Sequence, residues 1–116
     1  MQKAIANGNK YSAKDYAEAI DFMKRSYESY KEVFEDYHGV LSPSSPGVAP
    51  KGLKSTGTAE FNKYWSFMGT PCISLPLLQG ENNLPLGVQL IGGKYDDQRF
   101  LGTARWLEKK SEEYNE

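Results

Sequence analysis

Few residues in this chain have side chains suited to covalent chemistry, and these lie far apart in the sequence. The candidates for an activated nucleophile and its base are Cys72 and His38, because a Cys–His pair can activate sulfur. Cys72 begins an apolar run, where a cysteine is usually a small buried hydrophobic residue. His38 follows a long helical pattern, where an imidazole commonly complements the dipole of a helix C-terminus. We therefore expect both residues to be structural.

The sequence also lacks the residue sets that bind metals or phosphates. One histidine and one cysteine offer too few ligands for a zinc site, so we expect no metal and no cofactor. Asp96 and Asp97 form an acidic pair that a helix N-terminus explains more simply. Gly92-Gly93 has neither the spacing nor the following lysine of a phosphate-binding loop.

A proline-rich segment after the long helical pattern carries the serines Ser42, Ser44 and Ser45. A serine nucleophile needs free backbone N–H donors around it to stabilise an oxyanion. Pro43 and Pro46 bracket Ser44 and Ser45 and have no N–H to donate. No lysine or histidine stands beside these serines, so we expect them to line a cleft rather than to attack a substrate.

A long amphipathic helix over about 12–38 is the strongest structural signal. Ser12, three residues before Asp15, is a suitable N-cap, and we expect Gly39 to end the helix as a C′ residue. At 1.5 Å per residue the helix spans about 39 Å, whereas a compact domain of this length is about 35 Å across. Either its ends project, or its Tyr-rich face packs on something outside this chain, so both dimerisation and truncation fit. Its apolar positions recur every three or four residues, at Ala13, Tyr16, Ala17, Ile20, Met23, Tyr27, Tyr30, Phe34 and Tyr37.

The remaining pattern predicts a loop at 1–10 and a strand–helix–strand–strand–helix unit at about 40–110. The two later strands are apolar on both faces, which is typical of strands buried on both sides. Three strands with two or three helices cannot cover both faces of a sheet, so covering elements are expected to be missing. The predicted elements are a strand from Val40, a Thr58-capped helix at 59–68, strands at 72–78 and 84–91, and a helix from Asp96. We expect this last helix to fray into KKSEEYNE and to carry on one face Phe100, Leu101, Ala104 and Leu107.

Composition bounds the class of protein. The 116 residues suit one domain, and the formal net charge of −1 gives no basic field for nucleic acid or an anionic membrane. No apolar run approaches the roughly 20 residues of a membrane span. The single cysteine fits a reducing compartment, so we expect a cytoplasmic protein.

The stretch TGTAEFNKYWSFMGTPCISLPLLQGENNLPLGVQLIGGKYDD resembles the closing block of the amidase signature hydrolases. In that block a Thr-Gly and a Phe-Asn precede a Trp-containing short helix, followed by Gly-x-Pro, a Ser-x-Pro strand and Leu-Pro-x-Gly-x-Gln. Upstream, YSAKDYAEAI and VLSPSSPGVAP are similar to two further family segments. The matching positions here are Thr56-Gly57, Phe61-Asn62, Trp65, Gly69, Pro71, Ser74, Pro76, Leu84-Pro85, Gly87, Gln89, Gly92 and Asp96-Asp97.

The resemblance implies an α/β fold in which this chain is a C-terminal fragment of the amidase fold. Residues 1–116 would form a single segment, with about three strands of a mixed sheet, one long amphipathic helix and two shorter helices. The family hydrolyses amides with a Ser–cis-Ser–Lys triad that lies before the region matched here, and the chain has no Gly-Ser-Ser-Gly-Gly motif. We therefore expect no catalytic residue in this chain, no activity in it alone, and an artificial start at Met1.

The resemblance also implies a role in shaping a substrate channel. Our candidates for its lining are Ser42, Ser44, Ser45 and Trp65, although Trp65 in the core and serines that only make turns fit equally well. The expected partners are a small-molecule amide substrate, the remainder of the amidase domain and a second copy in a homodimer. Two alternatives stay open: an independent interaction or dimerisation domain, and part of an ammonia-delivering amidotransferase subunit.

Overall fold

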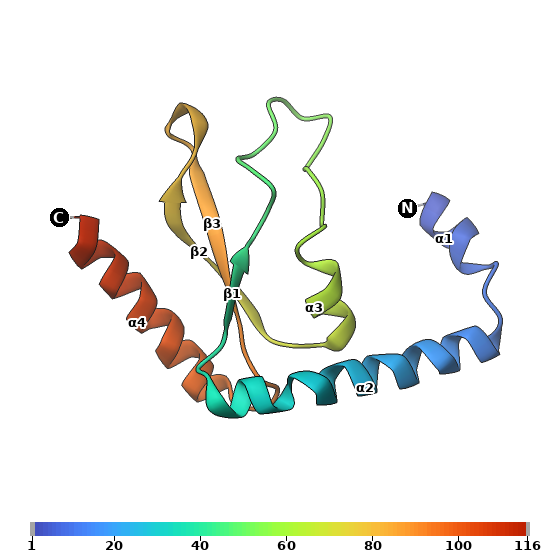
Figure 1. The fold of residues 1–116 in the computed structure, drawn as a ribbon. Coiled ribbons are helices and arrows are strands. Elements are labelled where there is room, and N and C mark those ends of the chain that lie inside the picture. Colours follow the sequence, from blue (N-terminus) through green and yellow to red (C-terminus); the bar gives the residue numbers. More distant parts are fainter. Residues whose placement is uncertain (1, 116) are drawn as a thin grey trace.

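The structure is a computed structural model that describes residues 2–115. Figure 1 shows a small sheet with a helix on either side and a long helix that runs across one end of the sheet and continues beyond it. In chain order the elements are α1 (Gln2–Gly8), α2 (Ala13–Asp36), β1 (Val40–Pro43), α3 (Lys63–Met68), β2 (Cys72–Gln79), the short 3₁₀ helix η1 (Glu81–Asn83), β3 (Pro85–Ile91) and α4 (Asp97–Asn115).

The start of α2 follows the prediction, but its end does not. Ser12 and Asp15 form a reciprocal capping box, in which the Asp15 carboxylate accepts the Ser12 backbone N–H at 2.7 Å. Hydrogen bonds from the Ser12 hydroxyl and then its backbone N–H lower the pKa of Asp15. The helix ends at Asp36 with Tyr37 as an extended C-cap, so the predicted cap at Gly39 is wrong.

The loop predicted at 1–10 is also wrong over most of its length, because residues 2–8 form α1. The run Lys3, Ala4, Ile5 and Ala6 contains good helix formers. The Asn-Gly-Asn sequence therefore ends a helix here instead of excluding one.

The three strands form one sheet in the order β1-β3-β2. Both pairings are antiparallel. The resemblance implies a mixed sheet, and the part of it that residues 2–115 form is antiparallel. The register of β2 shifts between Leu75 and Leu78, around Pro76, which has no N–H for the ladder. Much of β2 is exposed, so the prediction that it is buried on both faces is wrong for this edge strand.

One face of the sheet is apolar and packs on α4. The core consists of Leu75 and Leu90 from the sheet with Phe100 and Ala104 from α4. The helix continues to Asn115 instead of fraying after Leu107, and Leu101 is 56% exposed rather than on the packed face. Residues 100 and 104 share one helical face, whereas 101 is rotated about 100° away from 100.

The other face meets α3 and the long loop that precedes it. Helix α3 begins at Lys63, four residues after the predicted start, and ends at Met68 as predicted, followed by Gly69 as a left-handed C-cap with φ 69°. Asn62 makes no side-chain capping bond, and its Nδ2 donates to the carbonyl of Ser44 at 3.2 Å. The loop from β1 is thereby attached to the start of α3.

The chain is flat and extended, as the length of the long helix predicted. Its radius of gyration is 17.1 Å and its extents are 55 × 41 × 17 Å, whereas a compact chain of this length has a radius of about 13 Å. Along α2, Tyr16 is 69% exposed and Phe22 56% exposed. A large aromatic surface therefore has no cover within the described residues.

We predict that Gly39→Ala destabilises the chain. A Cβ at Gly39 would lie 2.7 Å from both the Ile91 carbonyl oxygen and Leu90 Cδ1, which forces the β1–β3 ladder apart. The expected loss is about 1–3 kcal/mol of unfolding free energy, measured by urea denaturation. Gly102→Ala is the matched control, since nothing lies within 4 Å of a Cβ there and alanine should stabilise α4 by about 0.5–1 kcal/mol. Equal effects of the two substitutions would contradict the packing at Gly39.

Candidate functional site

A row of polar residues crosses all three strands on the face that meets the long loop. Gln89 of the central strand β3 stands opposite Ser42 of β1 and opposite Ser74 of β2. Gln89 is only 3% exposed, so its amide has to find partners inside the protein. This row positions everything else at the site.

The Gln89 side chain holds three segments together. Its Nε2 donates to the Phe61 carbonyl at 2.7 Å and to the Pro43 carbonyl at 3.1 Å, and the Ser42 hydroxyl lies 3.5 Å away. Pro43 ends β1 and Phe61 lies just before α3. One buried amide therefore fixes both ends of the loop between β1 and α3.

Ser44 is held at the start of this loop by its backbone and its side chain. Its N–H donates to the Gly87 carbonyl at 2.9 Å, and its hydroxyl lies 2.6 Å from the hydroxyl of Ser74. A Cβ on residue 87 would lie 2.6 Å from Ser74 Oγ and 2.8 Å from Ser44 Oγ. The two hydroxyls can meet because residue 87 is glycine.

Beneath the loop lies a pocket of roughly 490 Å³. Among the described residues its polar side chains are all hydroxyls, and no acidic, basic, histidine or cysteine side chain lines it. Such a pocket can orient a ligand by neutral hydrogen bonds, but it has no group to take or give a proton in catalysis. The lining residues are Ser44, Ser45, Pro46, Gly47, Val48, Ala49, Pro50, Thr56, Gly57, Thr58, Ser74, Pro85 and Gly87.

The structure brings two of the three predicted serines together and places Ser42 and Trp65 elsewhere. Ser44 and Ser45 line the pocket, whereas Ser42 lies beside Gln89 and lines a different hollow. Trp65 packs edge-on against Tyr30 of α2, with ring centroids 5.5 Å apart, and so joins α3 to α2. Burial in this aromatic cluster raises the pKa of Tyr30, and the neighbouring Tyr64 raises it further.

Ser74, Gly87 and Asn62 were not among the predicted site residues. All three belong to the motifs that carry the family resemblance, so the sequence contained a signal for them. The strand register turns that signal into a site, because it sets Ser74 across from Gln89 and brings Gly87 against Ser44.

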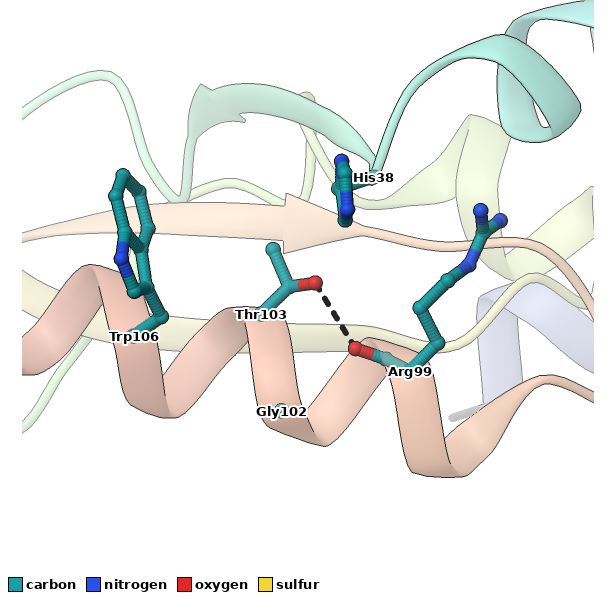
Figure 2. A pocket seen from close by; sticks show the side chains of 5 residues that line it. All are labelled: His38, Arg99, Gly102, Thr103 and Trp106. Atoms are coloured by element: carbon teal, nitrogen blue, oxygen red, sulfur yellow. Dashed lines mark hydrogen bonds between the residues drawn. The ribbon is translucent and has the colours of Figure 1, made fainter.

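His38 and Cys72 do not form a catalytic pair. His38 lines a hollow of roughly 470 Å³ together with Arg99, Gly102, Thr103 and Trp106 of α4. Figure 2 shows these side chains. Cys72 is not among the residues that line this hollow. Within the described residues, no group of three or more His, Cys, Asp or Glu side chains is placed to hold a metal ion.

The expected roles of these two residues also need correction. Arg99, not His38, complements the end of α2: its guanidinium donates to the Phe34 carbonyl and pairs with Asp96 at 2.6 Å. Cys72 is exposed rather than buried, because its strand forms the edge of the sheet. Desolvation of the sulfur itself raises the pKa of the Cys72 thiol, which disfavours the nucleophilic thiolate.

The fold and the comparisons with known proteins define the same class. A family model described as Amidase matches residues 1–101. The chain belongs to the amidase family. Its three-stranded sheet with flanking helices fits a fragment of the family's α/β fold, and none of the helices in residues 2–115 is long and apolar enough to cross a membrane.

The chain is similar over most of its length to several curated proteins. It is 32% identical over 103 residues to the glutamyl-tRNA(Gln) amidotransferase A subunit of Alkaliphilus metalliredigens, covering 82% of this chain and 21% of the relative. The corresponding amidotransferase A subunit of Thermotoga maritima is 33% identical over 107 residues, covering 87% and 22%. A fatty acid amide hydrolase of Arabidopsis thaliana is 27% identical over 111 residues, covering 85% and 18%. The chain thus spans about a fifth of the length of these relatives.

We predict that Gln89→Leu destabilises the fold and loosens the loop. The substitution leaves the Phe61 and Pro43 carbonyls without their donor, at a cost of about 1–3 kcal/mol. Urea denaturation measures the loss, and faster amide exchange at 44–62 reports the loosening. Gln79→Leu is the matched control, since Gln79 is exposed and its side-chain hydrogen bond to the Asn83 carbonyl is 3.4 Å long. We expect this substitution to change the unfolding free energy by no more than about 0.5 kcal/mol.

We also predict that Cys72 alkylates slowly at neutral pH despite its exposure. Since its pKa is raised above the ordinary value of 9.0, little thiolate is present at pH 7. The rate of reaction with iodoacetamide, followed by mass spectrometry from pH 6 to 10.5, should still be rising above pH 9. The same chain unfolded in urea is the control, with an ordinary thiol profile. A plateau near pH 7 in the folded chain would instead identify an activated nucleophile.

Proposed function

We propose that this chain is the C-terminal, non-catalytic part of an amidase-family hydrolase that cleaves carbon–nitrogen bonds in amides. In this proposal the Ser–cis-Ser–Lys machinery lies in the four-fifths of the protein that the chain does not span. The segment described here supplies structure and part of the substrate pocket, lined by Ser44 and Ser45.

The observation that carries the proposal is a built pocket without catalytic groups. Gln89 and Asn62 hold the loop over the pocket through the Phe61, Pro43 and Ser44 carbonyls, whereas no ionisable side chain of the described part of the chain lines it. A pocket that is rigid and neutral is suited to binding and orientation, and it leaves proton transfer to residues outside this segment.

The exposed aromatic face of α2 supports the second part of the proposal. Tyr16 and Phe22 are more than half exposed, and a large exposed apolar patch is typical of an interface. We propose that the remainder of the amidase domain covers this face, with a second copy of the chain as the competing occupant. The single cysteine supports a cytoplasmic location for the assembled protein.

A second candidate function is favoured by the names of several relatives. The Alkaliphilus and Thermotoga relatives are both amidotransferase A subunits, so the parent protein of this chain is alternatively such a subunit, which passes ammonia to a bound tRNA substrate. The hydrolase and the amidotransferase share the proposed role of this segment and differ in what accepts the product of amide cleavage.

We predict that the 116-residue chain alone hydrolyses no amide above the buffer rate. Activity is expected instead from a pair of chimeras. In one, residues 13–116 replace the matching segment of the Arabidopsis fatty acid amide hydrolase, and in the other they replace that of the Thermotoga amidotransferase protein. Each truncated host without the segment is the negative control, and each wild-type host the positive one.

The hydrolase proposal expects measurable amide hydrolysis from the first chimera and little ammonia transfer by the second. The reverse pattern would favour the amidotransferase alternative. Hydrolysis by the isolated chain would contradict the claim that its catalytic groups lie elsewhere.

A further inference from the structure

We propose that residues 46–58 form a movable flap over the pocket, and that the contact of Val48 with Gly80 holds this flap closed. The inference rests on the proposed function, which makes the pocket a binding site, and adds a device that sets how firmly the pocket keeps its ligand. Val48 and Gly80 are then positioning residues, since they act on a ligand only through the flap.

Both ends of the flap are anchored to the sheet. Before it, the Ser44 N–H donates to the Gly87 carbonyl at 2.9 Å. After it, Gln89 donates to the Phe61 carbonyl at 2.7 Å. Asn62 joins the two ends through the Ser44 carbonyl at 3.2 Å. The base of the flap is therefore fixed whether the flap is open or closed.

The flap itself has only local hydrogen bonds. The Ser45 hydroxyl donates to the Gly47 carbonyl at 2.6 Å, and the Gly57 N–H donates to the Ser55 hydroxyl at 3.1 Å. Within residues 2–115, no hydrogen bond joins residues 46–58 to a strand or a helix. A segment with so few ties to the rest of the protein opens at a low cost in free energy.

Val48 is the exception to the exposure of this segment. It is half-buried, whereas every other residue from 46 to 60 is exposed. A Cβ on Gly80 would lie 2.4 Å from Val48 Cγ1, so the valine methyl group sits directly on the glycine backbone. The Gly80 N–H donates to the Leu84 carbonyl at 2.9 Å, which fixes the turn that receives the methyl group. Burial of that group favours the closed flap.

The two arms of the flap are joined to each other. A Cβ on Gly57 would lie 3.7 Å from Pro50 Cγ, so the proline ring of one arm packs on the backbone of the other. Gly52, near the tip between them, has a φ of 91°, a conformation that glycine adopts without strain. Loss of the Val48–Gly80 contact therefore releases the flap as one unit.

The flap forms one wall of the pocket, and the sheet forms the other. Residues 46–50 and 56–58 line the pocket from the flap, and Ser74, Pro85 and Gly87 line it from β2 and β3. Figure 1 shows the loop after β1 and the β2–β3 turn projecting from the same end of the sheet, away from α2. Opening of the flap separates the two walls, as lids over binding sites do, and weakens the retention of a bound ligand.

The test moves one methyl group across the contact. Gly80→Ala places a Cβ where Val48 Cγ1 lies and should push the flap open. Gly80 has a φ of −105°, which alanine adopts freely, so the substitution acts through the overlap. Val48→Ala with Gly80→Ala removes the obstructing methyl group and nearly conserves the volume, and should close the flap again. Gly47→Ala is the matched control, since nothing lies within 4 Å of a Cβ there.

NMR of the full 116-residue chain reads the state of the flap. The wild type should show a nuclear Overhauser effect between the methyl groups of residue 48 and the Hα protons of residue 80. Gly80→Ala should abolish it and lower the ¹⁵N order parameters of residues 49–58 while those of the strands stay unchanged. The double variant should restore both signals, and Gly47→Ala should alter neither. A Gly80→Ala variant that keeps both signals, or a double variant that restores neither, overturns the proposal.

A second measurement places the same variants in the hydrolase chimera. Gly80→Ala should raise KM about fourfold, the effect of one buried methyl group, and leave kcat within about twofold. The double variant should return KM to its original value. A substitution that merely unfolded the protein would instead lower kcat through loss of active enzyme.

The two settings separate this inference from the proposed function. An active chimera whose KM does not respond to Gly80→Ala refutes the flap and leaves the proposed function standing. An inactive chimera, beside the expected NMR signals in the 116-residue chain, refutes the proposed function and supports the flap.

Discussion

A single buried amide constrains this structure more than any other side chain. Gln89 lies in the middle strand and is almost fully buried, where unpaired amide hydrogens would be costly. They are satisfied by carbonyls at the end of β1 and just before α3. Because these two points bound the long loop, the need to pair one amide determines where the loop begins and ends, and therefore where the pocket lies.

The same sheet has two faces with opposite chemistry. On one face Leu75 and Leu90 pack with Phe100 and Ala104 into an apolar core, and Arg99 ties that helix to the last turn of α2. On the other face Ser42 and Ser74 lie opposite Gln89 on the neighbouring strands, and the Ser44 hydroxyl meets that of Ser74. Apolar packing therefore stabilises one side of the sheet, and a row of polar side chains crosses the other.

The family and most of the helical framework could be predicted from the sequence, because they depend on local signals. Ser12 and Asp15 are three residues apart and form their capping box without help from distant residues, and α3 ends at the predicted residue, Met68, just before Gly69. The errors arise where distant residues compete. The helix predicted to start after Thr58 begins only at Lys63, Arg99 takes the role expected of His38, and Cys72 is exposed because its strand forms an edge of the sheet.

Motifs, periodicity and residue counts in the sequence were enough to place the chain with the amidases and to show that its long helix is too long for a compact domain of its size. They also led to the expectation that the catalytic residues lie outside this chain. Tertiary structure was needed to establish which serines meet, that Trp65 joins two helices instead of facing the pocket, and that Ser74, Gly87 and Gln89 share a site. The reason is physical: a strand's neighbours are set by register across segments tens of residues apart, and local sequence does not contain that pairing.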